Sequence, residues 1–162
     1  MPQMLEGRVV GTGRKFAVVA SRFNDLVVRR LVDGAVDAFR RHGVAEADLH
    51  VAWVPGAWEL PVVASSLFKA FPDLEGVVVL GCVIRGETAH FEHVAGPVSA
   101  QLAALSRESG KPVGFGVLTT DTLEQALQRA GAKAGNKGWE SAVAVLETAD
   151  LLASLAQGEA SR

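Results

Sequence analysis

The sequence predicts an α/β fold in which a four-stranded parallel sheet lies between two layers of helices, a three-layer α/β/α sandwich. Four apolar runs of strand length each precede a stretch in which apolar residues recur every three to four positions, the period of a helix. The connections between these runs are short, and parallel neighbours require right-handed helical crossovers. The run from Val77 to Ile84 has no polar alternation, which is typical of a strand buried on both faces of a parallel sheet.

The first strand and helix follow a short N-terminal segment. Residues 1–15 contain one short apolar patch and predict either an extended arm or an edge strand. Residues Phe16 to Ala20 form the first predicted core strand. The stretch from Leu26 to Arg41 places its apolar residues on one helical face, and Gly43 marks the end of that helix because glycine readily adopts the left-handed conformation.

The second and third units repeat this order. A strand is predicted from Leu49 to Val54, followed by a helix that begins near Pro61, a residue suited to a first helical turn, and runs to about Ala70. The third strand, Val77 to Ile84, leads through a glycine-containing loop into a helix. Pro97 lies inside that helix and is predicted to kink or restart it, because proline lacks the backbone N–H of the helical ladder.

The fourth unit completes the predicted sheet. Its strand spans Val113 to Leu118, and the segment Asp121 to Glu124 resembles a capping box at the start of a short helix. Gly131 closes this short helix. A final helix is predicted from Asn136 to about Leu155.

Length and charge limit the possible classes of protein. A chain of 162 residues that is 49% hydrophobic suffices for one substantial core but not for two typical domains. We therefore expect a domain over residues 16–156, between an arm of residues 1–15 and a loose tail of residues 157–162. The 16 basic and 18 acidic residues give a net charge of -2, which argues against a nucleic-acid or anionic-membrane partner.

Targeting signals and cysteine content point to a cellular compartment. The N-terminus lacks the basic start and apolar core of a signal peptide, and the longest apolar run is far shorter than the ~20 residues of a membrane helix. The single cysteine, Cys82, excludes an internal disulfide and suits a reducing compartment. We therefore expect a cytoplasmic protein.

Polar and aromatic residues gather in the loops that follow the predicted strands. In a doubly wound sheet these loops meet at the carboxyl edge, where ligands bind. The loop after Val77–Ile84 opens a helix, so its backbone N–H groups and the helix dipole can bind an anion. The residues of these loops are Arg22, Phe23, Asn24, Trp58, Glu59, Arg85, Glu87, Thr88, His90, Thr119, Thr120 and Asp121. Together they suggest a planar, hydroxylated ligand bound beside a phosphorylated one.

The histidines and the cysteine of this region have more ordinary explanations. His90 and His93, three positions apart, could ligate a metal, but the sequence offers no third ligand at zinc spacing. His90 could act in proton transfer or could be a surface residue at a helix N-terminus. Cys82 lies inside an apolar run, which favours a buried structural thiol over a nucleophile.

The aromatic and basic candidates are also open to two interpretations. Phe23 and Trp58 could bind a ring or could anchor their loops to the core. Arg129 and Lys137 flank the end of the short helix, where cations complement the helix dipole, so a solvated cap is the simpler interpretation.

Several of these motifs carry a resemblance to a known family. The segments are Ser21–Asn24, Val54–Pro61, Leu80–Val94, Phe115–Thr120 and Gln128–Gly138. In order and spacing they resemble the signatures of the 6,7-dimethyl-8-ribityllumazine synthase family, over about Phe16 to Leu155. The resemblance implies a flavodoxin-like fold. It also implies the penultimate step of riboflavin biosynthesis, in which 5-amino-6-(D-ribitylamino)uracil and L-3,4-dihydroxy-2-butanone 4-phosphate condense to the lumazine, phosphate and water, without a cofactor or metal ion.

The resemblance also implies roles for individual residues, motif by motif. His90 would be the proton donor, and Phe23 would stack on the pyrimidine. The ring edge and ribityl chain would be held by Ala57, Trp58 and Glu59, with Cys82, Val83 and Ile84 contributing mainly backbone. Phosphate would be bound by Glu87, Thr88, Arg129 and Lys137. Phe115 and Arg129 would line the site from a neighbouring subunit. Cys82 and Glu87 occupy variable motif positions, so their side chains are not expected to be essential.

The family resemblance further implies a homo-oligomer built on pentamers. The segment from Arg129 to Gly138 has no insertion of the kind associated with free pentamers, which favours an icosahedral shell that could enclose riboflavin synthase. One alternative is a non-catalytic flavin- or lumazine-binding module of the same fold. Another is a phosphoacceptor signalling domain, but its acidic cluster should follow the first strand, where this chain has Ser21 and Arg22.

Overall fold

The computed structural model describes residues 1–131 and 135–158, and in this part of the chain it contains one parallel sheet of four strands. The strands are β1 (Lys15–Ser21), β2 (Leu49–Val54), β3 (Leu74–Ile84) and β4 (Val113–Thr120). Their order across the sheet is β2-β1-β3-β4, with every neighbouring pair parallel. The predicted α/β fold class, with its four-stranded parallel sheet, is confirmed.

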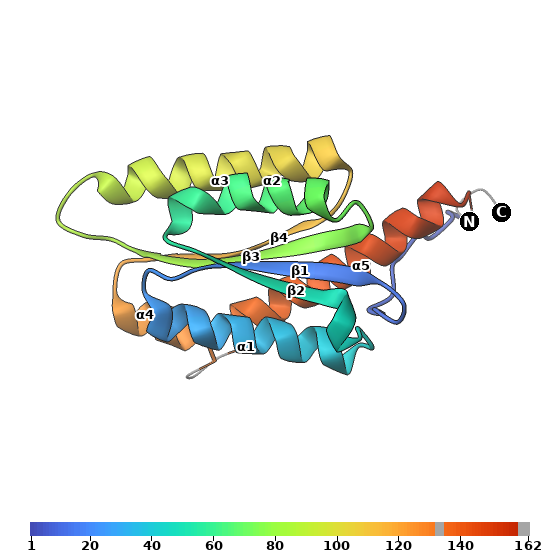
Figure 1. The fold of residues 1–162 in the computed structure, drawn as a ribbon, viewed down its shortest axis with the longest axis horizontal. Coiled ribbons are helices and arrows are strands. Elements are labelled where there is room, and N and C mark those ends of the chain that lie inside the picture. The colour runs from blue at the N-terminus through green and yellow to red at the C-terminus, as the bar shows by residue number, and fades with distance from the viewer. Residues whose placement is uncertain (132–134, 159–162) are drawn as a thin grey trace.

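Helices cover both faces of this sheet, as Figure 1 shows. The α-helices are α1 (Asp25–Arg41), α2 (Leu60–Ala70), α3 (His90–Ser109), α4 (Leu123–Arg129) and α5 (Lys137–Ala156), and two short 3₁₀-helices span Glu46–Asp48 and Ala57–Glu59. Helices α2 and α3 lie on one face, and α1, α4 and α5 on the other, so the layers are those of a flavodoxin-like sandwich. None of the helices in the described residues is both long enough and apolar enough to span a membrane.

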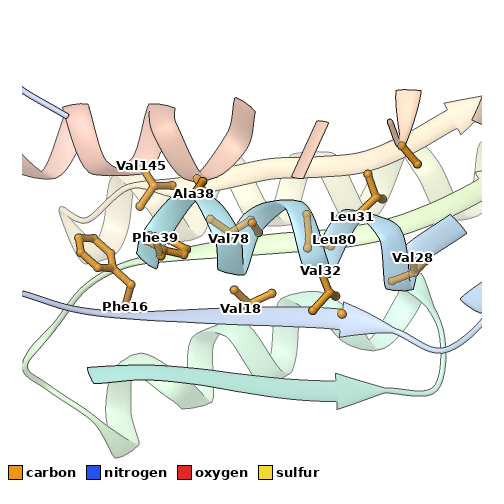
Figure 2. Packing of buried hydrophobic residues seen from close by; sticks show 14 of the residues in the cluster. Phe16, Val18, Val28, Leu31, Val32, Ala38, Phe39, Val78, Leu80 and Val145 are labelled. Carbon is orange, nitrogen blue, oxygen red and sulfur yellow. The ribbon is translucent and has the colours of Figure 1, made fainter. Parts of the chain in front are cut away.

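The core consists of two apolar clusters separated by the sheet. Successive side chains of a strand point to opposite faces, so Val18 packs with α1 and α5 while Val19 packs with α2 and α3, and both are fully buried. Figure 2 shows the first cluster, in which the ring of Phe16 stacks on that of Phe39 at a centroid distance of 5.0 Å. Burial on both faces explains why the central strands lack polar alternation.

Strand β3 begins at Leu74, earlier than the predicted start at Val77. The predicted strand began with the apolar run, which starts directly after Glu75 and Gly76. The structure explains the glycine by close packing, because a Cβ at Gly76 would lie 2.6 Å from a side-chain carbon of Val145. The strand therefore continues through Gly76 and pairs it with Phe16 of β1.

The predicted restart of a helix at Pro97 is wrong, because α3 runs without a break from His90 to Ser109. Pro97 lies on the exposed side of the helix. Its ring removes the N–H that would bond the carbonyl of His93, and a solvent-facing carbonyl can be hydrated instead. A single proline on this side is thus accommodated within one helix.

The capping residue of α4 is Thr122, one position later than the predicted box. The Thr122 hydroxyl oxygen accepts a hydrogen bond from the Gln125 backbone N–H at 3.1 Å. The Gln125 side chain in turn accepts one from the backbone N–H of Asp121 at 2.9 Å. Gly131 has a positive φ of 95° just after the helix, as its predicted closing role requires.

Residues 1–14 form no strand in the structure, so the predicted alternative of an edge strand is wrong; these residues are called the N-terminal arm below. The arm packs on α5, where Asp150 accepts hydrogen bonds from the backbone N–H of Arg8 at 2.7 Å and from the side chain of Arg14 at 2.8 Å. Both donors lower the pKa of the Asp150 carboxyl, and the backbone N–H of Arg8 has the largest effect. Residues 159–162 of the expected tail and residues 132–134 of the last motif lie outside the described residues.

Candidate active site

The carboxyl edge of the sheet contains an open cleft of about 680 Å³. Strand β1 lies between β2 and β3, and the loops that leave β1 and β3 lead to helices on opposite faces of the sheet. Such a switch point leaves a crevice between the two loops. The cleft is lined by Phe23, Pro55, Gly56, Ala57, Trp58, Glu59, Cys82, Val83, Ile84, Gly86, Thr88, His90, Phe91, His93 and Val94.

The first wall is the loop between β1 and α1. Its residue Asn24 adopts a left-handed conformation, with φ 59° and ψ 44°, which asparagine tolerates better than most residues. The Asn24 side chain donates a hydrogen bond to the carbonyl oxygen of Cys82 at 2.9 Å, and the Phe23 backbone N–H donates to Pro55 at 3.1 Å. The loop is thereby fixed to both neighbouring strands, and the Phe23 ring is left 71% exposed at the cleft.

The second wall is the segment that links β2 to α2. Residues Ala57–Glu59 form a 3₁₀-helix whose first bond runs from the Glu59 N–H to the Gly56 carbonyl. This tight turn directs Trp58 outward, where it is 62% exposed, and keeps the Glu59 carboxylate at the cleft. An exposed indole and an exposed phenyl ring at one cleft can hold a planar ligand, because neither is needed to fill the core.

The floor is the end of β3, from Cys82 to Ile84. The Cys82 side chain belongs to the buried cluster under α1, and burial raises the pKa of its thiol to about 11. The thiol is therefore protonated near neutral pH and is a poor nucleophile. The interpretation of Cys82 as a buried structural thiol agrees with this geometry, and the strand end offers backbone groups to a ligand.

The remaining wall is the β3–α3 loop with the first turns of α3. Thr88 and His90 line the cleft, and the His90 N–H lies 3.4 Å from the Thr88 hydroxyl oxygen. His93 also lines the cleft, one turn further along. No group of three or more His, Cys, Asp or Glu side chains placed to hold a metal ion occurs in residues 1–131 and 135–158.

The cleft of one chain leaves out part of the predicted site. Arg129 and Lys137 line a separate hollow of about 380 Å³ beside β4, together with Thr119 and Glu140. The guanidinium of Arg129 donates to the carbonyl of Gln125 in its own helix at 3.0 Å.

Two further predicted residues also lie apart from the cleft. Phe115 is 42% exposed on β4, an edge strand of the sheet, and Glu87 is exposed in the β3–α3 loop. Neither lines the cleft. These placements leave the predicted roles of all four residues untested by the single chain.

Sequence reasoning missed several lining residues. No role at the site was predicted for Phe91 or Val94, but both line the cleft. Gly56 lies in the segment Val54–Pro61, but no contact with a ligand was predicted for it. The signal that could have found Phe91 is its position in the first turn after a strand-to-helix loop, since that turn borders the carboxyl edge.

One comparison with known proteins bears on this site. A family model described as 6,7-dimethyl-8-ribityllumazine synthase matches residues 13–153. The matched region includes every residue of the cleft and of the hollow beside β4.

Proposed function

The chain belongs to the 6,7-dimethyl-8-ribityllumazine synthase family, and we propose that it condenses 5-amino-6-(D-ribitylamino)uracil with L-3,4-dihydroxy-2-butanone 4-phosphate. The observation that carries this proposal is the convergence of Phe23, Glu59 and His90 on one cleft with the backbone of β3. At about 680 Å³ the cleft is within the usual range of small-molecule sites, roughly 300–1,000 Å³.

The proposed pyrimidine site uses two of the walls and the floor. Phe23 stacks on the pyrimidine ring, and Ala57 to Glu59 hold the ring edge and the ribityl chain. Backbone groups of Cys82 to Ile84 complete the contacts. The exposed ring of Phe23 and the inert thiol of Cys82 support this assignment, because it asks for stacking and backbone hydrogen bonds but for no nucleophile.

The proposed phosphate site lies at the β3–α3 loop. Glu87 and Thr88 receive the phosphate of the second substrate there, close to the start of α3. The loop precedes a helix N-terminus, whose free N–H groups and dipole favour an anion. Arg129 adds positive charge from a neighbouring subunit, and Lys137 adds positive charge near the phosphate.

The reaction requires orientation and proton transfer. The 5-amino group attacks the ketone and water leaves to give an imine; phosphate is then eliminated, and a second water leaves as the ribityl-bearing nitrogen closes the ring. Holding the two substrates in register can supply about 7–11 kcal/mol of the barrier. His90 donates and accepts the protons of these steps, a contribution of about 10²–10⁴-fold. No cofactor is required by this chemistry.

The site is proposed to be shared between subunits. Neither Phe115 nor Arg129 lines the cleft that both are expected to complete, and Arg129 lines the separate hollow beside β4. A head-to-tail ring brings the hollow beside β4 of one subunit against the cleft of the next. We propose the family's pentamer as this ring, an icosahedral shell of pentamers that could enclose riboflavin synthase, and a cytoplasmic location, with residues 16–156 as the catalytic domain.

A direct assay tests the proposed function. The purified protein is mixed with both substrates, and lumazine fluorescence and phosphate release are followed together, with the His90→Ala variant in parallel. Equal amounts of lumazine and phosphate, formed faster than in buffer, are the expected result. Tight binding of lumazine or flavin without phosphate release would instead favour the non-catalytic module.

A further inference from the structure

Arg85, the first residue after β3, connects three parts of the carboxyl edge. Its Nε donates to the carboxylate of Asp121 at 2.9 Å, and its Nη1 donates to the carboxylate of Glu92. Its guanidinium carbon lies 4.5 Å from the ring centroid of Phe91. The Arg85 backbone N–H donates to Thr120 at the end of β4, at 2.8 Å. The residue thus joins β3, the β4–α4 loop and the first turn of α3.

The first turns of α3 have few other anchors. Within α3, which the structure describes in full, the buried residues are Val98 and Leu102, both in later turns. In the first two turns Val94 is only partly buried against the apolar cluster. The N–H groups of His90 and His93 make bonds of 3.4 Å to Thr88 and Ala89, which are long for hydrogen bonds. The contacts of Arg85 with Phe91 and Glu92 are therefore a main link between this segment and the sheet.

Charge argues against Arg85 as a direct ligand of phosphate. Its guanidinium already bonds two carboxylates, those of Asp121 and Glu92, so its positive charge is more than balanced. Both pairs are exposed, and exposed ion pairs contribute little to the free energy of unfolding. The planar guanidinium of Arg85 instead fixes the directions in which the two carboxylates are held.

We propose that Arg85 is a positioning residue for the reaction proposed above: it holds the first turn of α3 against the β4–α4 loop, so that His90 and Thr88 stay at the cleft. Only the expected effect on turnover rests on the proposed function; the structural link between Arg85 and α3 does not. A displacement of about 1 Å in a positioned group can cost on the order of 10²-fold in rate, so a residue outside the cleft can control turnover.

Kinetics of matched variants test the role. Arg85→Gln removes the charge and the fork, Arg85→Lys keeps the charge alone, and Arg41→Gln breaks a comparable exposed pair with Asp37 at the far end of α1. We expect kcat to fall at least tenfold in Arg85→Gln and less in Arg85→Lys, with KM for the uracil changed less than twofold. The Arg41 variant should match the parent chain.

A double variant separates positioning from phosphate binding. If Arg85 acts through His90, adding Arg85→Gln to His90→Ala should change kcat less than twofold further. If the main effect is instead a raised KM for the phosphate substrate that persists in the His90→Ala background, Arg85 is a ligand and the proposal fails. Unchanged kcat in Arg85→Gln would also overturn it.

Hydrogen exchange gives a readout that needs no turnover. The amides of residues 87–94 should exchange at least tenfold faster in Arg85→Gln than in the parent chain or in Arg41→Gln. Unchanged exchange overturns the proposed link, whether or not the protein makes lumazine. If the parent chain makes no lumazine but Arg85→Gln still exchanges faster than the parent chain, the proposed function is refuted and the structural link stands.

Discussion

The side chain of Asn24 donates a hydrogen bond to the main-chain carbonyl oxygen of Cys82 at 2.9 Å, across two adjacent strands. This contact fixes the loop that carries Phe23 to the strand end that forms the floor of the cleft. Both sides of the proposed pyrimidine site are therefore held by one side chain that need not touch the ligand.

Substitution of Asn24 should separate its two roles. Asn24→Gly keeps the left-handed backbone but loses the hydrogen bond, so KM for the uracil should rise about three- to tenfold, the equivalent of about 0.5–1.5 kcal/mol. Asn24→Ala should in addition lower the free energy of unfolding by about 1–2 kcal/mol relative to the glycine variant, since alanine is strained at positive φ. Steady-state kinetics and denaturant unfolding at equal protein concentration measure the two effects.

Replacement of His90 by alanine should lower turnover by about one to three decades, because a general acid–base group is lost. Affinity for the uracil should stay nearly unchanged, since Phe23 and Glu59 remain in place. Stopped-flow turnover and binding titrations check the two halves of this prediction. Wild-type turnover near neutral pH in the variant would remove His90 from the mechanism.

Arg129→Lys should raise KM for the butanone phosphate more than KM for the uracil. Lysine keeps the charge but loses the planar fork that binds phosphate oxygens in pairs. The comparison requires only the two Michaelis constants, measured in the same preparation. Equal effects on both would indicate that Arg129 is a helix cap, in line with its bond to Gln125.

Complementation tests the shared site. A Phe23 variant and an Arg129 variant, each inactive alone, should regain activity when co-expressed and assembled together. In a random equal mixture, about a quarter of head-to-tail interfaces would combine an intact Phe23 with an intact Arg129 of the neighbour. Native mass spectrometry verifies mixing, and mixed oligomers without activity above either parent would refute the shared site.

Asp150→Asn should loosen the N-terminal arm. The amide cannot accept both bonds that the carboxylate receives from Arg8 and Arg14, so the free energy of unfolding at pH 7 should fall by about 1–3 kcal/mol. The bonds lower the pKa of Asp150 in the folded state below its unfolded value, so this stabilisation is fully present above about pH 4 to 5 and is lost as the pH falls through the folded-state pKa. Unfolding of both proteins at pH 7, 5 and 3 should show the difference shrinking only at the lowest pH.

A matched control for the arm is Asp73→Asn, which breaks an exposed pair with Lys15. That substitution should leave the free energy of unfolding nearly unchanged, because both partners are exposed to solvent. A similar decrease in the free energy of unfolding in both variants would mean that the Asp150 contacts stabilise the protein no more than an exposed ion pair does.

The local sequence pattern predicted the helices and strands well, but it predicted contacts between residues far apart in the sequence poorly. The helix at α1 and the strand at β4 follow from periodicity, which is a property of neighbouring residues. Arg85 and Asp121 were both placed at the carboxyl edge, but their pairing depends on β3 lying beside β4, with Ile84 opposite Thr120. Neither periodicity nor spacing specifies that adjacency.

The candidate site shows the same division. Phe23, Trp58 and His90 were predicted from loop position and motif, and one cleft brings them together. Arg129 was assigned to the same site by resemblance, but it lines another hollow of the chain. A single chain cannot contain a site whose parts come from two subunits, so geometry within the chain gives no test of that role.

The docking of the arm on α5 has a consequence for biosynthesis. The contact between Arg8 and Asp150 spans 142 positions, nearly the whole chain, and α5 also covers β3 residues such as Val78. During translation the first segment cannot dock until the last helix is made, and the face of the sheet that α5 shares with α1 stays partly uncovered until α5 has left the ribosome. Parallel strands that pair over long separations close slowly. A message truncated before α5 should therefore yield an aggregating product, and chaperone demand should be highest late in synthesis.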